Sequence, residues 1–152
     1  STTIKVSESG IDALEQCYWC GLANSMVVDW LLRQSVSSTL NMFYLYQLPI
    51  PRLLSKDEKL QQVASRVARL ICTIPAYDAL AEDAGLHDHR DGVTDPTERA
   101  RLRAEIDGLV AHLYGLTDAE FLHILQTFPL VPEPARVAAY NAYRDVARGL
   151  IQ

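Results

Sequence analysis

The chain has 152 residues, of which 49% are hydrophobic and 22% charged, and its formal net charge is −5. This composition is typical of a globular protein that can bury a hydrophobic core, and it excludes a disordered chain. The negative charge argues against a protein that holds DNA unaided, because phosphate contacts supply most non-specific affinity and need a surplus of basic residues.

Three cysteines and the lack of a secretory signal pattern predict a cytoplasmic protein with free thiols. The longest apolar run, residues 17–32, is interrupted by Asn24 and Asp29 and is too short to cross a bilayer. We therefore expect no membrane association. Residues 1–10 are polar and do not begin with methionine, so we expect the chain to be a fragment excised from a larger protein.

The first element is predicted by hydrophobic residues at helical spacing, namely Ile11, Leu14, Tyr18 and Leu22. They indicate a helix from about residue 10 toward residue 33, in which Gly21 could introduce a kink. Residues 22–32 are apolar on nearly every side, so other elements must pack around them.

A change of period follows this helix. Residues 34–39 form a polar turn, and the alternation over residues 40–48 predicts a small β element. Pro49 and Pro51 then exclude a helix or a central strand.

The middle of the chain is predicted to form another helix. Ser55 and Glu58 have the spacing of a capping box, and the residues behind them form an apolar stripe that ends before Pro75. A short further turn is expected over residues 77–84. Residues 85–94 are polar and bounded by glycine, so they are expected to form an exposed loop.

The C-terminal third has strong helix-boundary signals. Asp95, Pro96 and Glu98 occupy the N-cap, first-turn and capping positions of one helix, and Gly115 is the expected stop. Thr117 and Glu120 repeat the capping box for a second helix, and a third follows the last prolines. We therefore predict a mainly α, helical bundle-like fold with a small β element around residues 40–48. Its predicted parts are residues 1–84, a loop over 85–94 and a C-terminal helical unit over 95–152.

Two segments resemble bacterial restriction–modification proteins. The first, LANSMVVDWLLRQ followed by STLNMFYLYQLPIPRL, resembles the distal end of the DNA target-recognition domain in large fused type II adenine-N6 DNA methyltransferases. Type I specificity subunits end their recognition domains similarly. The second, TERARLRAEIDGLVAHLYGLTDAEFLHILQTFPLV, resembles a helical segment near the C-terminus of the same methyltransferases. The two matches occur in the same order and span residues 22–131 with a dissimilar middle.

The resemblance implies a non-catalytic C-terminal fragment that helps recognise or position double-stranded DNA for adenine-N6 methylation. The glycine-rich loop for S-adenosylmethionine and the Asn/Asp-Pro-Pro-Tyr/Phe motif for the flipped adenine do not occur in this chain. The cofactor and the catalytic step are therefore expected in a separate methyltransferase domain of the parent, with which this fragment would associate. Whether the parent also cleaves DNA stays open.

The predicted turn after the first helix holds the candidate DNA contacts. Short or planar hydrogen-bonding side chains between rigid elements are of the type that reads base edges or phosphates. The alternative is ordinary turn chemistry, which serine, threonine and asparagine perform constantly. The candidate residues are Arg33, Gln34, Ser38, Thr39, Asn41 and Arg52.

Other groups have plainer interpretations. Cys17 and Cys20 have the spacing of a pair of zinc ligands, but the sequence has no second Cys-x-x-Cys. In the simpler interpretation, both cysteines are small buried hydrophobic residues. The loop residues His87 and His89 are interpreted as part of a solvated connector, although a cation or acid–base role is conceivable. No catalytic residue, bound cofactor or metal site is predicted for the chain itself.

Two further arguments bear on function. The alternating Arg99, Arg101 and Arg103 cannot all lie on one stripe, so they are expected to pair with Glu98, Glu105 and Asp107 rather than form a DNA-binding row. The acidic balance and the well-capped C-terminal helices favour an alternative from another class. In that alternative the chain is an all-helical protein-interaction or assembly module without DNA contact.

Overall fold

The computed structural model describes residues 11–35 and 46–151, and within those ranges the protein is mainly helical and contains no strand. The predicted mainly α class is thus confirmed. The α-helices are α1 (Ala13–Ala23), α2 (Met26–Ser35), α4 (Glu58–Ile71), α5 (Asp78–Asp83), α6 (Pro96–Leu113), α7 (Asp118–Gln126) and α8 (Glu133–Ala147). Two 3₁₀ turns, η2 (Pro75–Tyr77) and η3 (His89–Asp91), flank α5.

The predicted β element is not seen. Residues 40–45 lie outside the described part of the chain. Residue 46 is helical, and residues 47 and 48 form a turn and a bend instead of a strand. The backbone N–H of Ile50 donates to the carbonyl of Leu48 at 2.9 Å, which closes a tight local turn. Pro49 and Pro51 have no N–H to offer to a ladder, and residues 46–54 take part in no strand pairing.

The predicted N-terminal helix is divided into α1 and α2 at Asn24 and Ser25, and Gly21 lies within α1. The Asn24 side chain donates to the carbonyl of Cys20 at 2.8 Å and ends α1. The buried Ser25 hydroxyl donates to the Leu22 carbonyl at 2.8 Å and accepts from the Val28 N–H at 3.3 Å. Ser25 therefore closes one helix and caps the next.

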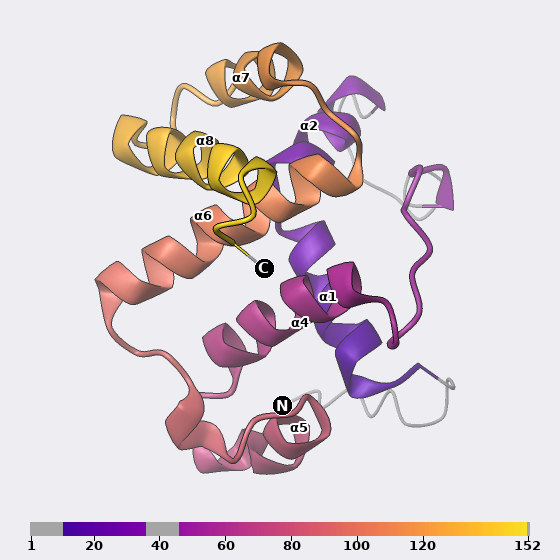
Figure 1. Ribbon diagram of the computed structural model, residues 1–152, viewed down its shortest axis with the longest axis vertical. Coiled ribbons are helices and arrows are strands. Elements are labelled where there is room, and N and C mark those ends of the chain that lie inside the picture. Colours follow the sequence, from indigo (N-terminus) through magenta and orange to yellow (C-terminus); the bar gives the residue numbers. More distant parts are fainter. Residues whose placement is uncertain (1–10, 36–45, 152) are drawn as a thin grey trace.

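Helix α6 is the central element of the molecule. It lies between α8 on one side and α4 on the other, and α1 crosses α4 below it (Figure 1). Gly108 permits the close crossing of α6 and α8, because a Cβ there would lie 2.6 Å from the Tyr143 backbone nitrogen. Gly21 serves α1 and α4 likewise, since its Cβ would lie 2.7 Å from Val63 Cγ1.

One hydrophobic core joins helices from both predicted units. It buries aliphatic and aromatic side chains that follow the predicted stripes of α4, α6 and α7. Tyr18 is 1% exposed and ties α1 to the Pro-x-Pro segment, because its hydroxyl donates to the Pro51 carbonyl at 3.0 Å. The largest fully buried members include Tyr18, Leu22, Val27, Leu60, Val63, Leu102, Val110 and Phe121.

The C-terminal helix boundaries agree with the prediction. Asp95 caps α6 by accepting from the Glu98 N–H at 2.9 Å, and Gly115 follows α6 with a φ of 66°. Thr117 and Glu120 form a complete capping box at α7.

Two predictions in the middle of the chain need comparison. The prediction for Ser55 was wrong, because Asp57 is the N-cap of α4. The Ser55 hydroxyl instead donates to the Asp12 carboxylate before α1. The predicted loop over residues 85–94 contains the 3₁₀ turn η3 and is attached to α4, since the Val93 N–H donates to the Arg69 carbonyl at 2.7 Å.

Candidate functional site

Arg33 lies in the last turn of α2 and is already engaged. Its guanidinium forms a two-pronged pair with the Asp29 carboxylate, with nitrogen–oxygen distances of 3.0 and 2.8 Å. The same group lies over the Phe128 ring, 4.8 Å from its centroid. Arg33 therefore connects α2 to the segment after α7, and a phosphate would have to compete with Asp29 for it.

The rest of the predicted turn is only partly described. Gln34 is exposed, and its amide donates to the Trp30 carbonyl one turn earlier at 3.4 Å. Ser38, Thr39 and Asn41 lie outside the described residues. Arg33 and Gln34 are thus the part of the predicted turn that the structure places, at the end of α2.

Arg52 lies apart from this turn, on a surface that we call the Trp19–Arg52 surface. Its members are Trp19 of α1 and Tyr46, Leu48, Ile50 and Arg52 of the following segment, and they line a hollow of about 350 Å³. Leu48 and Ile50 are half-buried and pack against the core, whereas Arg52 is exposed. Trp19 is 44% exposed and Tyr46 is 79% exposed, which places two aromatic rings and a cation in contact with solvent.

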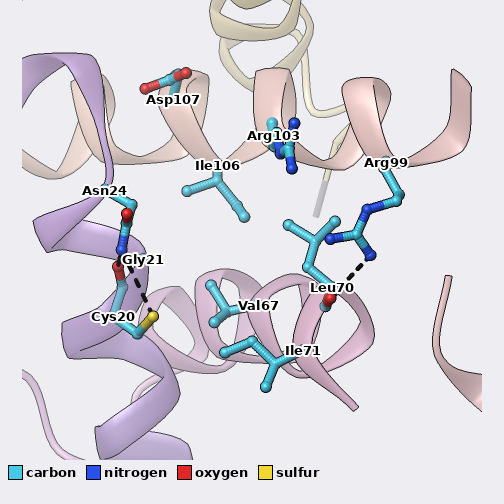
Figure 2. Close-up of a pocket in the computed structure, with 10 residues that line it drawn as sticks. All are labelled: Cys20, Gly21, Asn24, Val67, Leu70, Ile71, Arg99, Arg103, Ile106 and Asp107. Atoms are coloured by element: carbon cyan, nitrogen blue, oxygen red, sulfur yellow. Dashed lines mark hydrogen bonds between the residues drawn. The ribbon is translucent and has the colours of Figure 1, made fainter. Parts of the chain in front are cut away.

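A separate cavity of about 450 Å³ opens between α1, α4 and α6 (Figure 2). Its floor is apolar and consists of Val67, Leu70, Ile71 and Ile106. Its polar lining comes from two helices: Cys20 and Asn24 belong to the end of α1, and Arg99, Arg103 and Asp107 belong to α6.

The arginines of α6 have three different environments. Arg101 pairs with Glu98 and Glu105, as predicted. Arg99 instead donates through one nitrogen, Nη1, to the carbonyls of Leu70 at 2.9 Å and Val93 at 2.6 Å. Arg103 is exposed at the cavity, and no hydrogen bond or ion pair engages it within residues 11–35 and 46–151.

Asp107, on α6, is an acid with a strongly raised pKa. Its Oδ1 accepts from the Met26 N–H at 2.8 Å, so a residue of α6 caps the first turn of α2. Burial raises the pKa of this carboxyl to about 7, and the hydrogen bond from Met26 opposes that rise. Near neutral pH, Asp107 therefore exchanges between a neutral and a charged form.

The cysteines are free thiols in the structure. Cys17 and Cys72 are buried, whereas Cys20 is half-buried at the cavity. Burial raises the pKa of all three, to about 12 for Cys17, so each is a neutral thiol at physiological pH. Across the described ranges, no three histidine, cysteine, aspartate or glutamate side chains gather in a way that could hold a metal ion.

The predicted loop and its histidines have local roles. His89 Nδ1 lies 2.7 Å from Asp78 Oδ1, and the His89 N–H donates to the same oxygen at 2.9 Å. Asp88 accepts from both the backbone and the side chain of Arg90. His112 stacks on the Tyr143 ring with a centroid distance of 4.2 Å. The His89 contacts attach η3 to α5, and the His112 contact attaches α6 to α8.

Sequence reasoning did not single out the cavity between α1, α4 and α6. Arg103 and Asp107 were expected to join a surface charge network, and Asn24 was noted only as a polar break in an apolar segment. The available signal was an aspartate between Ile106 and Gly108, in the apolar stripe of a helix, where a charge needs a specific partner.

Comparison of the chain with models of protein families, with curated proteins and with solved structures gave no match. Among the described residues, no helix is long and apolar enough to cross a membrane.

Proposed function

We propose that this chain is a non-catalytic C-terminal part of a restriction–modification adenine-N6 DNA methyltransferase, and that it helps position double-stranded DNA. The observation that carries the proposal is the Trp19–Arg52 surface. It combines the exposed guanidinium of Arg52 with the exposed rings of Trp19 and Tyr46, and Tyr46 and Arg52 follow the candidate residues Ser38, Thr39 and Asn41 in the sequence. The resemblance of residues 22–53 to target-recognition domains motivates the DNA assignment.

The chemistry of this surface suits a nucleic acid. An exposed arginine contributes a phosphate contact, because its planar guanidinium offers paired donors to phosphate oxygens. Exposed aromatic rings supply stacking or edge contacts to sugars and bases. Within the described residues, Arg52 has no acidic partner that a phosphate would have to displace. In this respect it differs from Arg33, which Asp29 neutralises.

The proposal divides the work of the parent enzyme between this chain and the catalytic domain. Methyl transfer and S-adenosylmethionine binding belong to the parent's catalytic domain, and this chain has no catalytic role. The parent's methyltransferase domain is then the protein partner of the fragment, and the parent acts in the bacterial cytoplasm. The net charge of −5 fits such an arrangement, because the larger protein supplies most of the phosphate contacts.

The test is fluorescence anisotropy of the purified chain with mixed-sequence duplex DNA across a salt series. We expect weak affinity that falls with salt, and the Arg52→Ala variant should lower the slope of the log–log plot by about 1, as for one lost phosphate contact. Trp19→Ala should weaken binding at every salt concentration without changing that slope. Arg144→Ala is the matched control, because Arg144 is an exposed arginine on α8, which packs mainly on α6.

The same measurement is made on the isolated chain and on a mixture of the chain with the parent's methyltransferase domain. If Arg52→Ala changes DNA affinity in neither sample, the proposal is contradicted. The second candidate is then the helical assembly module. It is favoured by large hydrophobic side chains that remain exposed, such as Leu130 at 97% and Leu54 at 57%. Sedimentation at several protein concentrations would show it as self-association without DNA binding.

A further inference from the structure

We propose that the cavity between α1, α4 and α6 binds a small organic anion, whose carboxylate or phosphate head pairs with Arg103 and Arg99 and whose apolar body lies on the cavity floor. This site is separate from the Trp19–Arg52 surface and does not depend on the DNA proposal. The volume of about 450 Å³ lies in the range of cavities that hold small-molecule ligands.

The charge of the cavity favours an anion. Arg99 and Arg103 are one helical turn apart on the same face of α6, so two like charges lie side by side, an arrangement that destabilises a helix without a counter-charge. Two nearby acids are engaged elsewhere, since Glu98 pairs with Arg101 and Glu105 pairs with Arg66 and Arg101. Asp107 lines the cavity and accepts from the Met26 N–H, so one acid lies beside two guanidinium groups.

Arg99 is held in position for such a ligand. Its Nη1 is fixed by the carbonyls of Leu70 and Val93, and the bond to Leu70 is visible at the edge of the cavity in Figure 2. A guanidinium has five N–H donors, and the remaining ones of Arg99 have no partner in the described chain. Because its orientation is already fixed, little rotamer entropy is lost when an anion binds.

The floor selects for a ligand with an apolar body. Val67, Leu70, Ile71 and Ile106 give it no hydrogen-bonding side chain. An inorganic anion would contact only the rim, whereas an alkyl or aryl chain would also cover apolar surface at about 25 cal/mol per Å². The Asn24 amide, whose Nδ2 is bonded to the Cys20 carbonyl, adds a polar atom at the end of the cavity opposite Arg99 (Figure 2).

Cys20 provides a reporter inside the site. Its half-buried thiol lines the cavity, whereas Cys17 and Cys72 are buried and report only unfolding. The experiment measures alkylation of each cysteine by N-ethylmaleimide with peptide mass spectrometry, in the complete chain. Octanoate and octyl phosphate are the anionic probes, octan-1-ol is the neutral analogue, and acetate and inorganic phosphate lack the apolar body.

We expect both anionic probes to slow the alkylation of Cys20 saturably, at lower concentrations than octanol, acetate or phosphate require. Arg103→Ala should raise the octanoate concentration needed by about tenfold, because a charge-assisted hydrogen bond is lost. Arg103→Lys should lose less, and Arg144→Ala should lose nothing. Circular dichroism and the alkylation of Cys17 and Cys72 confirm that each variant is folded.

Three results would overturn the proposal. Protection of Cys20 that is unchanged in folded Arg103→Ala would remove the arginine from the site. Equal protection by acetate or inorganic phosphate would show that the apolar floor contributes nothing. Protection by duplex DNA and not by octanoate would assign the cavity to a DNA contact instead of a small ligand.

Discussion

Replacing Asp107 by asparagine should make the protein more stable at alkaline pH. The amide oxygen of asparagine can still accept the hydrogen bond from the Met26 N–H, which is 2.8 Å long in the structure. The amide stays neutral at every pH, so it avoids the desolvation cost that the ionised carboxylate bears. The variant thus separates the capping role of residue 107 from its charge.

The magnitude follows from the pKa of Asp107. Burial raises it from the usual value of 3.8 to about 7, and each tenfold change in proton affinity corresponds to about 1.4 kcal/mol. The folded state binds the proton more tightly than the unfolded state. The contribution of Asp107 to the stability of the wild-type protein is therefore fully present below the unfolded pKa and is lost as the pH rises through about 7.

Between pH 5 and pH 8 this loss amounts to about 2.6 kcal/mol at most. Because Asp107 is only partly buried, water screens part of the cost, and we expect about 1–2 kcal/mol. Urea unfolding followed by circular dichroism at both pH values gives the free energies. The difference between Asp107→Asn and wild type should be larger at pH 8 by that amount.

The contributions of the other titrating groups to the free energy of unfolding cancel when the variant is compared with the wild type. These groups include Asp12 and Asp88, whose pKa values are lowered by hydrogen bonds. Asp83→Asn, at an exposed position on α5, is the control, and its stability should depend on pH in the same way as that of the wild type. A parallel pH dependence of wild type and Asp107→Asn would refute the argument that this carboxyl is desolvated in the folded protein.

Two further predictions concern stability. Gly108→Ala should lower the free energy of unfolding by about 1–3 kcal/mol, because its Cβ would lie 2.6 Å from the Tyr143 backbone nitrogen and α6 and α8 would have to separate. Denaturant unfolding measures this change, and an unchanged midpoint would contradict the close crossing of the two helices. Thr117→Ala should cost about 1 kcal/mol by removing the capping box of α7. The pKa of Glu120 is lowered by hydrogen bonds from the backbone N–H and the hydroxyl of Thr117, and the variant removes only the hydroxyl, so that pKa should rise part of the way toward its usual value, which NMR titration of the side chain would detect.

The parts of the fold that were predictable from sequence depend on neighbouring residues. The caps of α6 and α7 involve residues three apart, and the sequence displays both partners of each bond. The division of α1 from α2 was only partly visible in the sequence: Asn24 and Ser25 mark it locally, but the N–H of Met26 finds its acceptor in Asp107, 81 residues later. Local apolar character continues through that division and predicts a single helix.

The same distinction applies to the candidate sites. Arg101 has acids three residues before and four residues after it, so its pairing could be predicted. The lack of a partner for Arg103 among the described residues could not be predicted. It results from two contacts between distant parts of the chain: Glu105 pairs with Arg66, and Asp107 accepts a hydrogen bond from Met26. The Trp19–Arg52 surface likewise depends on the contact between Tyr18 and Pro51, which joins residues 33 apart in the chain.

The bond between Met26 and Asp107 also has a consequence for the order of folding. Helix α2 has ten residues, too few to be stable alone in water. Ser25 caps it locally, but the bond from the Met26 N–H to Asp107 exists only once α6 has docked. The entropy of closing a long loop must therefore be overcome before α2 gains this bond. Helices α6, α7 and α8, with local caps or a short connection, can form early and serve as the template on which the N-terminal part of the chain condenses.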